Sequence, residues 1–237
     1  MTAPLSRRLL AEFLGSAFLA ALVIGSGIAA AELSDDVGLQ LLENAAATAA
    51  GLFAIILMFG PISGGHFNPV VSLVDAAFGG LARRDAIAYI PAQLAGCITG
   101  AVVANAMFAL SAISISTHHR ASPAHLFSEV IATLGLLLVI FALVRSGRAA
   151  TAPAAVGAYI GAAYWFTSST SFANPAISVG RMFSDTFAGI APASVPGFVV
   201  AQLVGGAAAI GLIRALYPDV AAEEAGEVVV PHELVRR

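Results

Sequence analysis

The fold of this chain is decided by Phe172-Ala173-Asn174-Pro175-Ala176-Ile177-Ser178, whose plan an earlier stretch repeats as His66-Phe67-Asn68-Pro69-Val70-Val71-Ser72. Each Asn-Pro step predicts the start of a helix, because asparagine is a favoured N-cap and proline is tolerated at the first helical position. We expect one helix from 69 to about 78 and another from 175 to about 187, since glycine or proline follows each of them. Both are too short to cross a bilayer. Two half-length helices, duplicated in one chain, are typical of membrane transport proteins.

The composition predicts an integral membrane protein. Hydrophobic residues make up 59% of the 237 positions and charged residues only 11%, a balance that would make a globular domain of this length insoluble. The formal charge is −3 and no basic face with interleaved aromatic residues occurs, which argues against a nucleic acid partner. The single cysteine, Cys97, excludes an intrachain disulfide and is interpreted as a small packing residue.

Six apolar segments reach about 20 residues, the length that crosses the hydrocarbon core of a bilayer. They run over 9–31, 41–60, 86–110, 126–145, 152–168 and 195–217. Three landmarks recur at offsets of 117, 106 and 109 residues, which pair Glu12 with Glu129, Asn68 with Asn174, and Gln93 with Gln202. Each half therefore holds three spans and one half helix. Because three is an odd number, the second half enters the membrane from the opposite side, and the halves are inverted repeats.

The arginines set the predicted orientation, because cytoplasmic loops carry the excess of basic residues. In this topology nine arginines fall on one side of the membrane, and only Arg120 and Arg181 fall on the other. Both termini are therefore expected in the cytoplasm. We expect a single transmembrane channel domain over 1–217, with repeats over about 1–115 and 116–217, followed by a polar tail over 218–237.

The inverted topology brings the N-termini of the two short helices together near the middle of the membrane. Each N-terminus presents free backbone N–H groups and a partial positive charge of about half an elementary unit, which repels a cation or a proton. As caps, Asn68 and Asn174 accept backbone hydrogen bonds through their side-chain oxygens, while their NH₂ groups face whatever passes. The loops before the helices, 62–66 and 168–171, would expose carbonyls along a water-filled cavity. This arrangement predicts a path for neutral solutes that carry oxygen atoms.

These motifs, in this order, resemble the aquaporin family, also called the major intrinsic proteins. The resemblance covers the chain up to about Pro218 and rests on Ser63-Gly64-Gly65-His66-Phe67-Asn68-Pro69-Val70, on Asn174-Pro175-Ala176, and on the paired glutamates and Gln-Leu-x-Gly motifs. It implies an all-α membrane protein with six transmembrane helices and two re-entrant half helices in inverted repeats. It also implies one pore per subunit, a homotetramer surrounded by membrane lipid, and passive transport without a cofactor or enzymatic activity.

Two departures from the family pattern bear on selectivity. Val70 replaces the alanine that is usual in the first motif, and Ile177 stands where most members have an arginine that narrows the outer pore. By the same resemblance, the other selectivity-filter positions are Thr48, Ala162 and Ser171, which gives an opening that is wide, uncharged and partly apolar. Arg181 lies one helical turn beyond Ile177, and we expect it to make a surface or loop contact, with a reach back toward the pore mouth as the alternative.

The resemblance also implies roles for the residues around the two motifs. The pore constriction is expected at Asn68, Pro69, Val70, Asn174, Pro175 and Ala176, and the lining at Gly64, Gly65, His66, Ser169 and Thr170. Glu12 and Glu129 are interpreted as supports of the re-entrant loops, with a proton relay as the alternative, because intramembrane carboxylates need partners. His66 is interpreted as a plain lining residue, with a pH-sensitive gate as the alternative. The loop histidines His118, His119 and His125 are interpreted as solvated, and no metal site is expected.

A wide filter without arginine favours glycerol-like polyols, urea, undissociated metalloid hydroxides such as arsenite, and water. The segment that follows Asn174 is also similar to bacterial members linked to arsenic resistance, so we expect a bacterial inner membrane protein. One alternative is a water-selective aquaporin. Another is a secondary transporter, which also uses inverted repeats and broken helices but needs a coupling site. An intramembrane enzyme lacks a credible set of catalytic residues.

Overall fold

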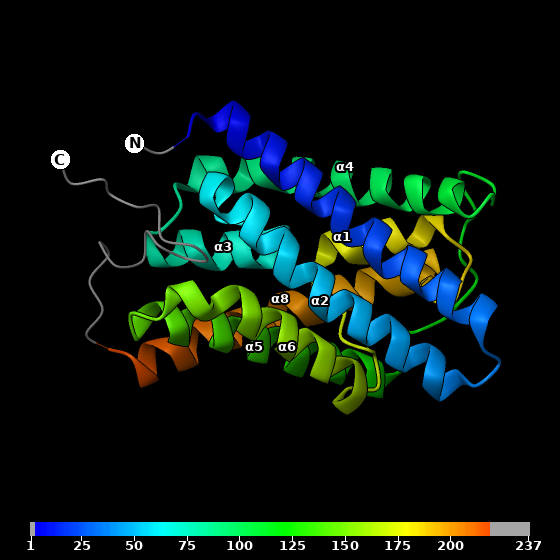
Figure 1. The fold of residues 1–237 in the computed structure, drawn as a ribbon. Coiled ribbons are helices and arrows are strands. Elements are labelled where there is room, and N and C mark those ends of the chain that lie inside the picture. The colour runs from blue at the N-terminus through cyan, green and yellow to red at the C-terminus, as the bar shows by residue number, and fades with distance from the viewer. Residues whose placement is uncertain (1–2, 219–237) are drawn as a thin grey trace.

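The computed structural model describes residues 3–218, so the predicted polar tail from 219 onward lies outside the described residues. Within that range the chain forms a bundle of long helices without a strand (Figure 1). The long helices are α1 (Leu5–Leu33), α2 (Val37–Ser63), α4 (Arg83–Met107), α5 (Pro123–Arg145), α6 (Ala152–Phe166) and α8 (Val195–Leu216). Five of these regions are long and apolar enough to span a membrane, whereas α6 has 15 residues and is shorter. The predicted all-α membrane fold, with two short helices between the long ones, is confirmed.

The two short helices begin at the Asn-Pro steps. α3 (Pro69–Phe78) is capped by Asn68 and ends at Gly79, whose φ of 87° is left-handed and therefore suits glycine. α7 (Pro175–Gly180) is capped by Asn174 but has only six residues, followed by a 3₁₀ turn over Arg181–Phe183. The expectation that this helix continues to about 187 is wrong.

α7 ends early because other parts of the chain donate hydrogen bonds to the carbonyls that the next helical turn would need as acceptors. The carbonyl of Arg181 accepts a hydrogen bond from the Ile190 amide at 3.3 Å, and that of Met182 from the Ser116 amide at 2.9 Å. The carbonyl of Phe183 accepts from the side-chain amide of Asn105, also at 2.9 Å. An α-helix needs these acceptors for amides four residues onward, so it stops here.

The two repeats pack in the same way. α1 packs against α4 in the first repeat, and α5 packs against α8 in the second. Glycines at equivalent positions allow each approach, since a Cβ on Gly96 would lie 2.3 Å from the carbonyl oxygen of Phe13, and one on Gly205 would lie 2.6 Å from that of Val130. Small residues at such crossings let the helix backbones come close.

The start of α1, the end of α3 and the end of α8 lie at one end of the bundle, on the left of Figure 1. The arginines Arg7, Arg8, Arg83, Arg84, Arg145, Arg148 and Arg214 occur at or beside the helix ends found there. Arg120 and Arg181 belong to the connections at the opposite end. The charge asymmetry expected from the sequence is therefore present in three dimensions.

Candidate functional site

Two asparagines tie the repeats together at the centre of the molecule. The side-chain oxygen of Asn68 accepts a hydrogen bond from the Val70 amide at 2.9 Å, and its Nδ2 donates to the carbonyl of Ala173 at 2.7 Å. Asn174 makes the equivalent pair, accepting from the Ala176 amide at 2.9 Å and donating to the carbonyl of Phe67 at 2.8 Å. Each NH₂ group has two hydrogens, so one N–H of each asparagine remains for another partner.

The residue before each asparagine has a left-handed backbone. Phe67 and Ala173 both have a φ of 48°, which is unusual for a residue with a side chain and costs about 1–3 kcal/mol. This turn directs the carbonyl of each residue at the asparagine of the other repeat. Such strain persists only where the surroundings hold it in place.

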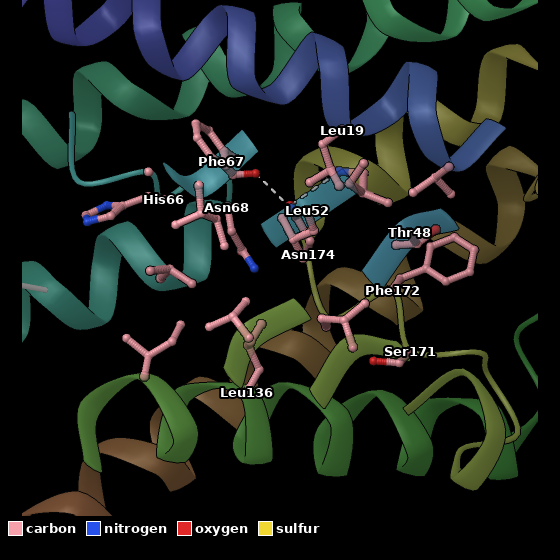
Figure 2. A pocket seen from close by; sticks show the side chains of 18 of the residues that line it. Leu19, Thr48, Leu52, His66, Phe67, Asn68, Leu136, Ser171, Phe172 and Asn174 are labelled. Atoms are coloured by element: carbon pink, nitrogen blue, oxygen red, sulfur yellow. Dashed lines mark hydrogen bonds between the residues drawn. The ribbon is translucent and has the colours of Figure 1, made fainter. Parts of the chain in front are cut away.

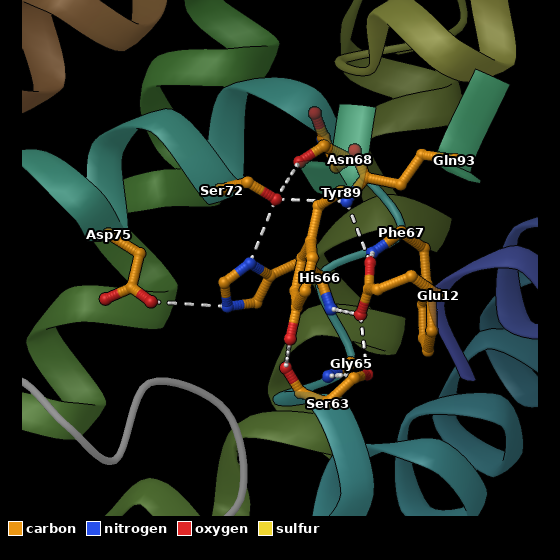
Figure 3. A network of polar contacts seen from close by, with 10 residues as sticks. All are labelled: Glu12, Ser63, Gly65, His66, Phe67, Asn68, Ser72, Asp75, Tyr89 and Gln93. Carbon is orange, nitrogen blue, oxygen red and sulfur yellow. Dashed lines mark hydrogen bonds and ion pairs between the residues drawn. The ribbon is translucent and has the colours of Figure 1, made fainter. Parts of the chain in front are cut away.

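Glu12 holds the first strained loop. Its carboxylate accepts hydrogen bonds from the Ser63 hydroxyl at 2.6 Å, the His66 amide at 3.0 Å, the Phe67 amide at 2.7 Å and the Gln93 side-chain amide at 2.8 Å (Figure 3). The residue is fully buried. A buried carboxylate is costly unless it is hydrogen-bonded, and four donors meet that requirement.

Glu129 repeats the arrangement in the second half. It accepts from the Ser169 hydroxyl at 2.6 Å, the Phe172 amide at 2.9 Å, the Ala173 amide at 2.8 Å and the Gln202 side-chain amide at 2.6 Å. This residue too is fully buried. Each glutamate thus supplies the hydrogen bonds that keep one re-entrant loop in its strained shape.

Ser72 and Ser178 extend both networks to the asparagines, a role that the sequence analysis missed. Gln93 donates to the Ser72 hydroxyl at 3.0 Å, which lies 3.2 Å from the carbonyl of Asn68. Gln202 donates to the Ser178 hydroxyl at 3.0 Å, which donates to the carbonyl of Asn174, also at 3.0 Å. The signal was available, since a serine stands four residues after each asparagine.

A cavity passes between the two asparagines. Figure 2 shows His66 toward one end of it, Asn68 and Asn174 midway, and Thr48 and Ser171 toward the other end. The rest of its wall is mostly aliphatic and includes Leu19, Val23, Leu52, Ile56, Val71, Leu136, Ile140, Val156, Ile160 and Ile177. A solute in this cavity would meet polar groups at both ends and midway, and apolar groups elsewhere.

Some predicted lining and constriction residues do not border this cavity. Gly65 and His66 line it, but Gly64 forms the C-cap of α2 and the Ser169 hydroxyl is directed to Glu129. The other predicted residues that do not line it are Pro69, Val70, Thr170, Pro175 and Ala176. Val70 instead packs toward α8, where a Cβ on Gly206 would lie 2.6 Å from its Cγ1.

The structure contradicts the assignment of Ala162 to the filter. Ala162 is exposed on the outside of α6 and does not line the cavity. The cavity face of this helix carries Val156, Ile160 and Tyr164, which are four residues apart and therefore share one side. The Tyr164 hydroxyl lies 3.2 Å from that of Thr48, so tyrosine and not alanine stands beside Thr48.

Arg181 makes the expected loop contact, through Ala188, but it is not at the surface, and it also reaches the cavity, which was the alternative. This residue is only 3% exposed and lines the cavity near Ser171, Phe172 and Ile177. Its Cζ lies 3.5 Å from the centroid of the Phe172 ring, and its Nε donates a hydrogen bond to the carbonyl of Ala188. The cavity wall therefore contains an arginine, although no arginine follows Ala176 directly.

His66 has a partner that the sequence analysis did not assign. Its Nε2 lies 3.4 Å from Oδ2 of Asp75, and its Nδ1 lies 3.0 Å from the Ser72 hydroxyl (Figure 3). Asp75 is 3% exposed, and its Oδ1 has no hydrogen-bond partner among residues 3–218. The ring is therefore fixed at the cavity wall by groups of α3.

At the opposite end, the loop after α4 is fastened to the segment after α7. The Thr117 amide and hydroxyl donate hydrogen bonds to Oδ1 of Asp185 at 2.8 and 3.1 Å. The hydrogen bond from the amide is the main cause that holds the pKa of this exposed carboxyl below its ordinary value. His118 lies 3.8 Å from the same oxygen. No group of three histidine, cysteine or acidic residues suited to a metal ion occurs within the described range.

Comparisons with known proteins agree with this geometry. Residues 1–180 match the family model described as Major intrinsic protein. The chain is 50% identical over 210 residues to aquaglyceroporin AqpS of Rhizobium meliloti (strain 1021), covering 89% of this chain and 90% of the relative. It is 32% identical over 222 residues to aquaporin Z of Brucella melitensis, covering 87% and 95% of the two chains. The X-ray structure of the aquaglyceroporin from Plasmodium falciparum shares the fold, with a TM-score of 0.72 at 22% identity over 91% of this chain and 98% of that one.

Proposed function

This chain belongs to the major intrinsic protein family, and on that premise we propose that it is a passive membrane channel for water and small neutral solutes such as glycerol. The observation that carries the proposal is the cavity between two helix N-termini capped by Asn68 and Asn174. The free N–H of each asparagine can donate to a passing oxygen atom, and the aliphatic wall accommodates the carbon side of a polyol. The two helix dipoles oppose cations at the same point.

The range of solutes is proposed from the residues near Ile177. An isoleucine cannot donate hydrogen bonds or narrow the pore as an arginine does, so glycerol, urea and undissociated metalloid hydroxides such as arsenite are proposed to pass with water. We place the filter at Thr48, Tyr164, Ser171 and Ile177, with Tyr164 replacing Ala162. A water-selective pore is not favoured, because the relative with 50% identity is named an aquaglyceroporin.

A secondary transporter is not favoured either, because it needs a carboxylate that can bind a coupling ion. Glu12 and Glu129 are buried in the spans, and each already accepts four hydrogen bonds from the protein. We therefore propose transport without coupling, chemical reaction or cofactor.

We further propose that the protein is a homotetramer in a bacterial inner membrane, with both termini in the cytoplasm. The arginines gathered at one end of the bundle support this orientation. Large exposed apolar side chains, among them Trp165, Phe166 and Val200, need lipid or a neighbouring subunit around them. Native mass spectrometry from mild detergent tests the tetramer, and a dominant monomer would contradict it.

Stopped-flow light scattering on proteoliposomes tests the channel. Vesicles challenged in turn with sorbitol, glycerol, urea and arsenite should respond to glycerol, urea and arsenite far faster than empty vesicles, without saturation and without a proton gradient. Flux that saturates and follows a proton gradient would instead support the transporter.

Ile177→Arg tests the filter within the same assay. This variant should slow glycerol and arsenite at least about tenfold, equivalent to about 1.4 kcal/mol of barrier, while largely sparing water. Ile177→Val is the matched control, because it changes volume slightly and adds no charge. An unchanged solute profile in Ile177→Arg would contradict the proposed filter.

A further inference from the structure

Arg181 sits at the end of the cavity that holds Thr48 and Ser171. It follows α7 directly, one helical turn beyond Ile177, and it lines the cavity although it is 3% exposed. It stands one turn after Ile177, the position of the family's usual arginine, and both residues line the same cavity. The guanidinium therefore has access to the solute path.

The surroundings of Arg181 fix its guanidinium in one place. One face stacks on Phe172 with Cζ 3.5 Å from the ring centroid, a cation–π contact. Phe172 is itself held by an edge contact with Phe198, at 5.0 Å between centroids and 75° between planes. The Nε hydrogen bond to the carbonyl of Ala188 fixes the remaining rotation. An arginine held in this way is preorganised for binding.

The rest of the guanidinium is unused by the protein. Within residues 3–218 only Nε donates to a protein acceptor, and no carboxylate lies within ion-pair distance of this arginine. Arginine has five N–H donors, so the four on its terminal nitrogens are left for water or a solute. Leaving buried donors unpaired is costly, which favours an occupant with oxygen atoms.

Ser171 gives an independent indication of a polar occupant. Its hydroxyl is buried and has no hydrogen-bond partner among the described residues, although the residue lines the cavity and is only 3% exposed. The hydroxyls of Thr48 and Tyr164 lie 3.2 Å apart in the same wall. Three hydroxyls and one cation thus line this end of the cavity.

Arg120 provides a contrast on the other side of Phe172. Its Nε donates to the carbonyl of Gly189 at 2.8 Å, and its Nη2 donates to that of Phe187 at 3.1 Å. Its Cζ lies 5.6 Å from the Phe172 ring centroid, and it does not line the cavity. Arg120 therefore fastens the loops, whereas Arg181 does not use its terminal donors for this.

We infer that Arg181 is a specificity-determining residue of this pore and supplies, from one turn later, the cation missing at Ile177. The inference rests on the proposed channel function. With the Ser171 hydroxyl, the guanidinium recognises small neutral solutes that offer two or more oxygen acceptors, such as polyols and undissociated trihydroxides. Its charge adds to the helix dipoles against protons and other cations. The outer opening is therefore charged, although the apolar residue directly after Ala176, Ile177, suggests a neutral one.

Arg181→Met tests this assignment in proteoliposomes, because methionine removes the charge and the donors but keeps much of the length. Proton leak, followed with an entrapped pH dye under an imposed potential, should rise at least about tenfold, equivalent to about 1.4 kcal/mol of barrier. The ratio of glycerol to water permeability should change in the same variant. Arg181→Lys keeps the positive charge and should therefore leak as few protons as the wild type. Arg120→Met should leave the proton leak and the permeability ratio at wild-type values.

The double variant Ile177→Arg/Arg181→Met should also leak little, since it returns the cation to the adjacent turn. A wild-type leak and an unchanged permeability ratio in Arg181→Met would overturn the assignment, as would an equal change in Arg120→Met. If Arg181→Met does not fold, Arg181→Gln keeps a polar side chain without charge and should show the same rise in leak. Wild-type vesicles that pass no glycerol would refute the proposed function itself, so the two failures are distinguishable.

Discussion

Replacing Glu129 by alanine should destabilise the second re-entrant loop severely. The substitution leaves four buried donors without their acceptor, namely those of Ser169, Phe172, Ala173 and Gln202. A buried donor left unpaired costs about 1–3 kcal/mol, and the low end of that range for each donor gives about 4 kcal/mol. Removal of one partner from a buried charged network costs a similar 3–5 kcal/mol. The left-handed turn at Ala173 also loses one of the bonds that holds it.

The measurement is thermal unfolding of purified protein in detergent, followed by circular dichroism. A loss of about 4 kcal/mol in a chain of this size lowers the unfolding temperature on the order of 10 °C. Glu129→Gln should lower the unfolding temperature by about half as much, because the glutamine side chain keeps one oxygen acceptor but turns an NH₂ donor toward other donors. Glu32→Ala is the control, since Glu32 is exposed at the end of α1.

Two results would refute this reasoning. If Glu129→Ala unfolds at the wild-type temperature, the four hydrogen bonds do not support the loop. If Glu129→Gln keeps the wild-type unfolding temperature but loses flux together with its pH dependence, Glu129 acts in proton transfer, and the relay interpretation replaces the structural one.

Three further predictions concern packing, the cavity wall and the loops. Gly96→Val should lower the free energy of unfolding by about 1–3 kcal/mol or more, because its Cβ would meet a carbonyl oxygen at 2.3 Å. Gly211→Ala is the control: it has open space and should raise the free energy of unfolding by up to about 1 kcal/mol. Thermal unfolding measures both. Ile160→Phe should slow glycerol flux in proteoliposomes by narrowing the cavity, and Ala162→Phe, on the outside of the same helix, should not; equal effects would contradict the placement of α6. The pKa of Asp185 is lowered, so its hydrogen bonds stabilise the loop at pH values above the ordinary pKa of 3.8, and this stabilisation is lost as the pH falls through the folded pKa. Hydrogen exchange of the Thr117 amide should therefore accelerate on the acid side. Asp185→Asn is the control, because it lacks this titration.

The spans and both helix starts were predictable because they depend on local properties. An apolar run of about 20 residues and an Asn-Pro cap each act within one segment, and duplication supplied a second copy to compare. The pairing of Glu12 with Glu129 in the sequence indicates two equivalent positions. The particular donors of each glutamate were not predictable, since Gln93 and Gln202 reach them from helices about 70 to 80 residues away in sequence.

Two expectations failed where the outcome depended on distant residues. α7 stops early because the amides of Ser116 and Ile190 take its next carbonyls. Ala162 faces outward because packing against neighbouring helices, and not the count of residues from Asn174, sets the face of α6 that borders the cavity.

Caps, hydrophobic lengths and the duplication are properties of the chain, so they already specify that two inverted repeats meet at two asparagine-capped half helices. Which side chains border the path depends instead on how the helices and loops pack. Arg181 reaches the cavity because Phe172 and Ala188 hold its guanidinium there, and both contacts exist only after the loops have packed together.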